Sequence, residues 1–208
     1  MAATAKNTRR TASREQRRQQ LINATMKCIA RKGMSSTSIG DVAKEAGLSQ
    51  GIINLHFNSK DNLLNETLRH LADEYKATFN KTLENSGPGA ADKLIALVEL
   101  DLQSSIVNRQ KIAVWFAFWG EVKSRPAYRK ICGERDQYYD EVIEGLCETI
   151  IAEGRYQRIS ARNVGIALNS ITNGMWLSYL ISPGTFDRGE AMTALTDLLH
   201  RYFPKHFS

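Results

Sequence analysis

The segment from Ile39 to Asn58, IGDVAKEAGLSQGIINLHFN, constrains the fold of this chain more than any other. Its first half has apolar residues at the i, i+3, i+4 and i+7 spacing of one helix face, at Ile39, Val42, Ala43 and Ala46. Gly47 follows, where a left-handed backbone conformation ends a helix without a side-chain clash. Ser49 is a good N-cap for a second helix. The segment therefore predicts two short helices joined by a tight turn.

The second of these helices has a polar face. Its isoleucines alternate with Gln50, Asn54 and His56, whose side chains could reach base edges if the helix lay in the major groove of DNA. An ordinary pair of packed helices has the same spacing, so spacing alone leaves both interpretations open.

Charge favours the interpretation as a DNA-binding element. Residues 1–60 contain eleven Lys and Arg against three acidic residues, a net charge of +8, although the whole chain carries only +6. Residues 61–208 therefore sum to −2. The basic character surrounds the helix pair, as a phosphate-binding surface requires.

The sequence TSIGDVAKEAGLSQGIINLHFNSKDNLL, from Thr37 to Leu64, resembles the N-terminal DNA-binding domain of TetR-type repressors. The resemblance implies base contacts from Gln50, Gly51, Ile52 and Asn54. It implies contacts to the DNA backbone from Thr37, His56 and Lys60, although His56 packs internally in many members. The family usually has tyrosine at the position of Asn54, so the operator sequence does not follow from the resemblance.

The chemistry of these side chains suits base reading. Gln50 and Asn54 can each pair bidentately with adenine, and Ile52 can pack on a thymine methyl group. The N-terminal arginines either add non-specific affinity by displacing counterions or stay solvated. They are Arg9, Arg10, Arg14, Arg17 and Arg18.

Composition describes a water-soluble globular chain of 208 residues with 42% apolar and 24% charged residues. Three cysteines, an odd number without CxxC spacing, indicate reduced thiols and a cytoplasmic location. No segment approaches the roughly 20 apolar residues of a membrane span, so no membrane partner is expected. The basic N-terminus superficially resembles a transit peptide, but no hydrophobic core or cleavage-like site follows it.

Catalysis is not indicated. The four histidines are scattered without metal-ligand spacing, and neither a glycine-rich phosphate loop nor a Ser/His/Asp set can be proposed. We therefore expect no enzyme activity, no metal and no cofactor.

Helical periodicity runs through the whole chain, so we predict an all-α fold of about nine helices. A disordered basic arm (1–13) precedes a three-helix DNA-binding domain (14–59), whose first helix spans 14–32. A larger ligand-binding and dimerisation domain (60–208) follows, and its first helix, at about 60–84, connects the two. The segment NSGPGA at 85–90 ends that helix. Further helices are expected at about 91–108, 109–123, 126–152, 160–181 and 188–202.

Aromatic residues concentrate in the second domain, where all three tryptophans lie. We predict a ligand site formed by Trp115, Trp119, Tyr138, Asn173 and Trp176. Aromatic faces and a nearby carboxylate hold a quaternary ammonium group, which has no N–H donor. Asp101, Glu121, Asp136 and Glu141 are unranked candidates for that carboxylate. Aromatic stripes at helical spacing also form ordinary cores.

The segments 114–139 and 171–187 resemble the C-terminal domain of the choline-responsive BetI type within the TetR family. The resemblance implies a repressor released from its operator by choline or a related quaternary amine, through a shift between two conformational populations. A polyamine or an apolar effector stays open, and so does a non-specific architectural DNA-binding protein.

The family resemblance also implies a homodimer formed through the helices at 160–181 and 188–202. A dimer suits a palindromic operator of double-stranded DNA, because one recognition helix covers only a few base pairs. The expected interface stripe is Val164, Leu168, Ile171, Met175 and Tyr179. The alternative is that this stripe faces the core of its own domain.

Overall fold

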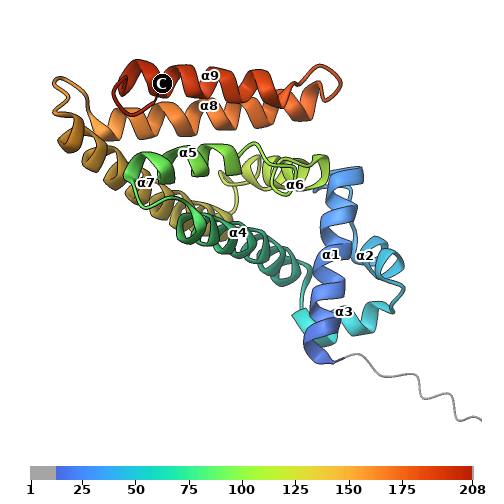
Figure 1. Ribbon diagram of the computed structural model, residues 1–208. Coiled ribbons are helices and arrows are strands. Elements are labelled where there is room, and N and C mark those ends of the chain that lie inside the picture. Colours follow the sequence, from blue (N-terminus) through green and yellow to red (C-terminus); the bar gives the residue numbers. More distant parts are fainter. Residues whose placement is uncertain (1–12, 208) are drawn as a thin grey trace, which may run out of the picture.

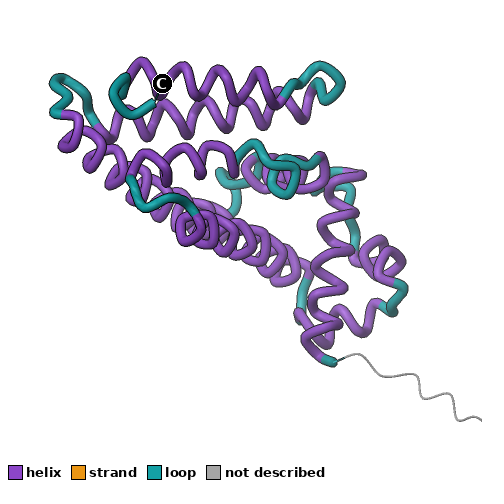
Figure 2. Tube along the Cα trace, in the orientation of Figure 1, coloured by secondary structure: helices purple, strands orange, loops and turns teal. Residues whose placement is uncertain are grey.

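The computed structural model describes residues 13–207, and within that range it is helical without strands (Figure 2). The helices are α1 (Arg14–Lys32), α2 (Ile39–Ala46), α3 (Gln50–Phe57), α4 (Lys60–Asn85), α5 (Ala90–Leu100), α6 (Arg109–Trp119), α7 (Pro126–Gly154), α8 (Ala161–Ile181) and α9 (Arg188–Tyr202). The predicted all-α class is confirmed. The predicted arm at 1–13, with Arg9 and Arg10, lies outside the described residues except for Ser13, which caps α1.

Two predicted helices end earlier than expected. The helix predicted to reach residue 108 stops at Leu100, and residues 101–107 form turns. Three apolar residues in that segment, Leu102, Ile106 and Val107, are buried, and their spacing imitates a helix face. The backbone carbonyl of Asp101 instead accepts a hydrogen bond from the indole of Trp176 at 2.8 Å. The helix predicted to reach residue 123 likewise ends at Trp119.

Helices α1 to α3 pack around one small apolar core. Leu21 and Cys28 of α1 are fully buried against this core, as is Ile53 of α3. Two residues separate the end of α3 from the start of α4. The first turns of α4 close the same core through Leu63 and Leu64. Burial of these side chains holds α3 at a fixed angle to α4, since α3 is too short to be stable alone.

The remaining helices form a second body. Figure 1 shows α8 and α9 side by side at one end of the molecule, α1 to α3 at the other, and α4 running between them. Helix α7 packs on α4, α5 and α8, and α6 packs on α1 and α8. The end of the chain is anchored by buried Phe203 and Phe207, and Tyr156 and His206 are joined by a 3.0 Å hydrogen bond.

Two of the five residues predicted for the dimer interface face the core of their own domain. Val164 and Leu168 are buried, and Tyr179 packs edge-to-face on Phe186. Ile171 of the same stripe is exposed and Met175 is half-buried, so the stripe is divided between the core of the domain and its surface. The apolar side chains that α8 exposes are Ile166, Ile171, Leu177 and Ile181. Within residues 13–207, no helix has the length and apolar character needed to cross a membrane.

Candidate functional site

The turn between α2 and α3 has the geometry that its glycine predicts. Gly47 adopts a left-handed conformation with φ 64°, and its N–H contacts the carbonyls of Ala43 and Lys44. Leu48 adds a backbone hydrogen bond to Ala43 at 2.9 Å. Ser38 caps the start of α2 by a reciprocal pair of hydrogen bonds with Asp41. These local contacts fix the direction in which α3 leaves α2.

Helix α3 has one buried and one exposed face, as the sequence predicts. Ile53 and Phe57 are buried. The predicted base-reading residues Gln50, Gly51 and Asn54 are exposed, and Ile52 is half-buried. Leu55 is 70% exposed on the same short helix, and sequence reasoning missed it. An apolar side chain exposed to this degree beside polar ones suits contact with a thymine methyl group.

Arg18 does not belong to a solvated arm. Its guanidinium donates hydrogen bonds to the carbonyl of His56 and to the carboxylate of Glu66, both at 2.9 Å. It also lies 4.7 Å from the ring centre of Phe57. Arg18 therefore ties α1 to the end of α3 and to α4, and the expectation that it acts as a free basic side chain was wrong.

The three residues predicted to contact the DNA backbone differ in availability. The Thr37 side chain is buried, and its hydroxyl donates to the carbonyl of Gly33 at 2.8 Å. His56 is partly buried with its Nδ1 enclosed, whereas Lys60 is the first residue of α4 and makes no ion pair within residues 13–207. The geometry leaves Lys60 as the best placed of the three to meet a phosphate.

Part of the basic excess holds the first two helices together. Glu45 of α2 lies 3.1 Å from Arg31 and 3.8 Å from Lys27, both on α1. Lys32 and Asp41 form a further ion pair between the same helices. These cations support the orientation of α2 and so the position of α3.

The three tryptophans meet, although they come from two helices far apart in sequence. The ring centres of Trp115 and Trp119, both on α6, lie 5.9 Å apart. Trp119 stacks on Trp176 of α8 with ring centres 6.4 Å apart and planes at 9°. Trp176 also meets Tyr75 of α4 edge-to-face at 6.3 Å. We call Tyr75, Trp115, Trp119 and Trp176 the aromatic cage.

A cation already occupies this cage. The guanidinium carbon of Arg135, on α7, lies 4.8 Å from the ring centre of Trp115 and 5.5 Å from that of Trp119. The third ring is that of Tyr75, at 5.7 Å. All three distances fall within the roughly 6 Å over which a ring face attracts a cation. The cage therefore has the chemistry of a cation-binding site.

One of the four candidate carboxylates lies at the cage. Asp101 Oδ1 accepts a hydrogen bond from the hydroxyl of Tyr75 at 2.6 Å and a longer one from Tyr139 at 3.4 Å. Desolvation raises the pKa of Asp101 to about 7, and the positive charge of Arg135 opposes that rise. This carboxyl group therefore changes charge near neutral pH, where a bound cation would stabilise its ionised form.

The other three candidate carboxylates have different partners. Asp136 accepts a hydrogen bond from Nε of Arg135 at 2.7 Å. Glu121 is bonded to the hydroxyl of Ser124, and Glu141 is exposed and bonded to Gln137.

Two predicted ligand residues lie outside the cage. Tyr138 donates its hydroxyl to Asn80 at 2.6 Å, and Nζ of Lys76 lies 4.2 Å from its ring centre. Asn173 bonds to Asn169 of the same helix at 2.8 Å. Both residues were predicted to touch the ligand with the tryptophans, and in the structure each bonds to a partner outside the cage. On α7 the helical phase turns Tyr139, and not Tyr138, towards Tyr75.

Tyr75 and Tyr139 lie at the aromatic cage but were not among the ligand residues predicted from the sequence. Tyr139, next to Tyr138, points inward and stacks on Tyr75 with ring centres 5.0 Å apart. Tyr75 continues the buried stripe of α4, after Leu68 and Leu71. That stripe could have identified Tyr75 as inward-facing, but nothing in the local sequence places it beside α6 and α8.

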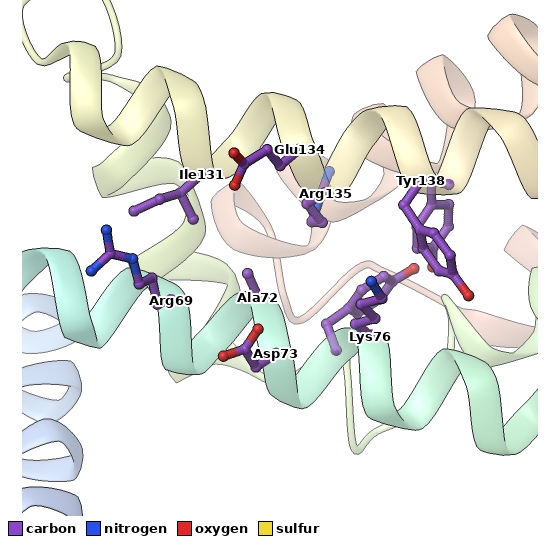
Figure 3. A pocket seen from close by; sticks show the side chains of 10 residues that line it. Arg69, Ala72, Asp73, Lys76, Ile131, Glu134, Arg135 and Tyr138 are labelled. Atoms are coloured by element: carbon purple, nitrogen blue, oxygen red, sulfur yellow. The ribbon is translucent and has the colours of Figure 1, made fainter.

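A cleft lies between α4 and α7 (Figure 3). Its volume is about 220 Å³. Its lining includes Tyr75, Arg135 and Tyr139, which belong to the cage or touch it, and Tyr138 stands on its wall. The cleft and the cage therefore share a boundary, and Arg135 lies on it.

The helices that carry the cage also touch the DNA-binding part. Helix α6, with two of the tryptophans, packs on α1, and α4 follows α3 directly. Lys111 of α6 is 3.0 Å from Glu74 of α4, and Arg125 is 2.9 Å from Asp61 at the start of α4. The cage is therefore connected to the DNA-binding part in two ways, through the packing of α6 on α1 and through α4, which follows α3.

Comparison with known proteins agrees with both parts of this geometry. Residues 21–67 match the family described as bacterial regulatory proteins of the tetR family, and residues 90–204 match the C-terminal domain of BetI-type transcriptional repressors. The HTH-type transcriptional regulator BetI of Ectopseudomonas mendocina is 32% identical over 190 residues, covering 88% of this chain and 91% of that protein. BetI of Paraburkholderia phymatum is 32% identical over 187 residues, covering 89% and 92%.

Two solved structures have the same fold. A transcriptional regulator from Pseudomonas aeruginosa PAO1 superposes with a TM-score of 0.81 at 26% identity, covering 98% of this chain and all of that one. A regulator from Saccharomonospora viridis in complex with choline gives a TM-score of 0.79 at 24% identity, covering 88% and 95%. The relatives are named as regulators, and regulators of this family are not enzymes. The chain belongs to the TetR family of bacterial regulatory proteins and carries a BetI-type repressor C-terminal domain.

Proposed function

We propose that this regulator is a repressor whose affinity for its operator falls when choline or a related quaternary amine binds in the aromatic cage. One observation carries the proposal. The positive charge of Arg135 lies among the rings of Tyr75, Trp115 and Trp119. The carboxyl group of Asp101 accepts a hydrogen bond from the hydroxyl of Tyr75. The choline complex of the Saccharomonospora viridis regulator supports it.

The chemistry of the cage favours a quaternary amine over the other effector classes. A polyamine carries many N–H donors and needs several acceptors, whereas the cage presents chiefly ring faces and one carboxylate. An apolar effector would bring no positive charge to the ionised form of Asp101 in its desolvated surroundings. A methylated ammonium group satisfies both features.

The reading head we propose consists of the exposed face of α3 and the start of α4. Gln50 and Asn54 would read adenine edges, with Gly51 allowing close approach, while Ile52 and Leu55 would contact thymine methyl groups. Lys60 would contact a phosphate. His56 and Thr37 would act mainly by holding α3 in place, since both are engaged within the head.

A homodimer with two such heads would bind a palindromic operator in the cytoplasm. Helices α8 and α9 are the proposed interface. Their support is the row of exposed apolar residues on α8, in which Ile166 is 53% exposed and Leu177 is 41% exposed. Isolated apolar side chains are normal on a surface, but a row on one helix face marks an interaction site.

Coupling between the sites would be a population shift. A ligand that binds one arrangement of α4 and α6 more tightly favours that arrangement, and DNA affinity falls by the same coupling free energy. By analogy with the TetR family, the two arrangements would differ in the distance between the two DNA-reading heads of the dimer.

The direct test titrates a complex of the protein and operator DNA with choline and follows fluorescence anisotropy of the DNA. The operator comes from selection of bound sequences from random DNA. Trp115→Phe keeps a ring in the buried position but weakens attraction for a cation, so choline affinity should fall by about fivefold. Tyr138→Phe, at the cleft but outside the cage, should change it by less than about twofold. Release of operator at equal choline concentration in all three proteins would contradict the assignment of the cage.

A further inference from the structure

Arg135 is placed unusually for a long charged side chain. Only 9% of its side chain is exposed, and its guanidinium lies among the rings of Tyr75, Trp115 and Trp119. Its Nε donates to Asp136, a residue of the same helix that is 42% exposed. The cation is thus paired with a partly exposed carboxylate while its guanidinium carbon lies near three rings of the aromatic cage.

A guanidinium and a quaternary ammonium group can each bind to the same aromatic ring faces by cation–π attraction. Both are weakly hydrated cations that aromatic faces attract, and the attraction is strongest when the cation lies within about 6 Å of the ring centre. Arg135 meets that criterion on three rings. The two cations would overlap in space, and their like charges would repel in a desolvated site. A second cation therefore enters only if Arg135 leaves.

The cleft between α4 and α7 offers space for the Arg135 side chain outside the cage. Arg135 lies on the wall between the cage and the α4–α7 cleft, which has a volume of about 220 Å³. Asp73 of α4 and Glu134 of α7 also line this cleft, as Figure 3 shows. A rotation of the arginine side chain out of the cage would bring the guanidinium to carboxylates instead of leaving it unpaired.

We infer that Arg135 is a built-in competitor of the effector: its guanidinium fills the aromatic cage in the ligand-free protein and swings into the α4–α7 cleft when a cationic effector binds. This inference rests on the proposed function. It makes Arg135 a specificity-determining residue, because a neutral molecule has no advantage over the guanidinium in the cage. It also sets the effector concentration at which the repressor responds. The apparent affinity for the effector is lower when a smaller fraction of the protein has a cage free of Arg135.

The test compares the choline dissociation constants of three variants with that of the intact chain by calorimetry. Arg135→Gln removes the cation but keeps a side chain able to bond to Asp136, and choline should bind about tenfold more tightly. Arg135→Lys keeps a cation at the cage, so its affinity should stay within about threefold of the original. Arg129→Gln changes an exposed arginine of the same helix and should have no effect. Thermal unfolding of each variant checks that the fold is retained.

The outcomes separate the two hypotheses. Tighter binding by Arg135→Gln alone, or binding by that variant when the intact chain shows none, supports the competitor role. If the intact chain binds choline and Arg135→Gln binds equally or more weakly, the competitor role is overturned while the proposed effector stands. If neither protein binds choline or tetramethylammonium, the effector class itself is wrong.

A second measurement examines the ligand-free state without any effector. The Cδ–H protons of an arginine side chain held against three rings are shifted upfield in the proton–carbon NMR spectrum of the full chain. We expect one such signal, absent from Arg135→Gln and moved towards the ordinary arginine position by choline. The absence of any upfield signal assignable to Arg135 would overturn its placement in the cage.

Discussion

Single residues in this protein divide into those that recognise and those that hold the recognising residues in place. Arg18 shows the second role, because it joins α1, α3 and α4 by two hydrogen bonds and a contact with the Phe57 ring. We propose the first role for Asp101, because its hydrogen-bond partner Tyr75 is a wall of the cage. Local sequence marks neither role, since each depends on contacts more than 20 residues away.

Asp101 predicts a pH dependence of effector binding. Since its pKa is raised to about 7, the carboxyl is largely neutral at pH 6 and ionised at pH 8. If only the ionised form attracts the cation, choline should bind about tenfold more tightly at pH 8 than at pH 6. Asp101→Asn should bind choline weakly at both pH values. A pH-independent affinity in the intact chain would contradict this role.

The same pKa has a consequence for stability. The folded protein keeps a proton on Asp101 that the unfolded chain releases, because burial raises the pKa above its ordinary value of 3.8. This carboxyl therefore lowers the free energy of unfolding as pH rises from about 4 towards 7. Asp101→Asn removes that contribution, so its stability relative to the intact chain should improve with rising pH.

Lys60 predicts a specific salt dependence. Lys60→Ala should weaken binding to all DNA sequences and reduce the slope of log affinity against log salt by about one unit per reading head. The control is Lys81→Ala, an exposed lysine near the other end of α4. Fluorescence anisotropy at several salt concentrations measures both slopes. An unchanged slope for Lys60→Ala would count against a phosphate contact.

At the scale of elements, the position of α3 depends on a backbone conformation that few residues adopt. Gly47 has φ 64°, and an added Cβ there would meet no atom within 4 Å, so only the backbone opposes a side chain. Gly133 in α7 is also free of nearby atoms, but its backbone is helical. The two glycines therefore form a matched pair that differs only in backbone conformation.

This pair predicts opposite effects of one substitution. Gly47→Ala should lower the free energy of unfolding by about 1 kcal/mol, because a left-handed conformation is unfavourable for alanine. Gly133→Ala should raise it by up to about 1 kcal/mol, because alanine is the better helix former. Urea unfolding measures both changes. Equal effects in the two variants would show that the turn does not need its left-handed residue.

On the scale of the whole molecule, the aromatic cage lies where the two parts of the chain meet mechanically. Helix α6 contributes Trp115 and Trp119 and packs on α1, while α4 contributes Tyr75 and continues directly from the base of α3. Displacement of a side chain in the cage therefore acts on the two elements that orient the reading head. Helices α8 and α9, which we propose as the dimer interface, lie at the far end of the molecule (Figure 1).

The proposed assembly makes a further prediction. Leu177→Glu places a charge in the exposed apolar row of α8, so the variant should elute as a monomer in size-exclusion chromatography with light scattering. It should also lose affinity for a palindromic operator. Leu55→Glu makes the same change on α3, and it should abolish operator binding while the protein stays dimeric. A dimeric Leu177→Glu variant would exclude this interface.

The sequence alone determined what local periodicity and turn chemistry control. The order of the helices, the left-handed Gly47 and the exposed polar face of α3 all follow from residues within a few positions of each other. It also determined that the three tryptophans share one region, since apolar phase on α6 and α8 turns them inward.

Tertiary structure decided which side chains surround the three tryptophans. Tyr138 and Tyr139 are neighbours in sequence, but only the packing of α7 on α4 decides that Tyr139 faces Tyr75. The same packing brings Arg135 to the tryptophans and selects Asp101 from four candidate carboxylates. A helix face turns by about 100° per residue, so a small difference in how a helix is packed changes which residue meets the site. That phase is set by contacts between helices and not by the sequence of any one of them.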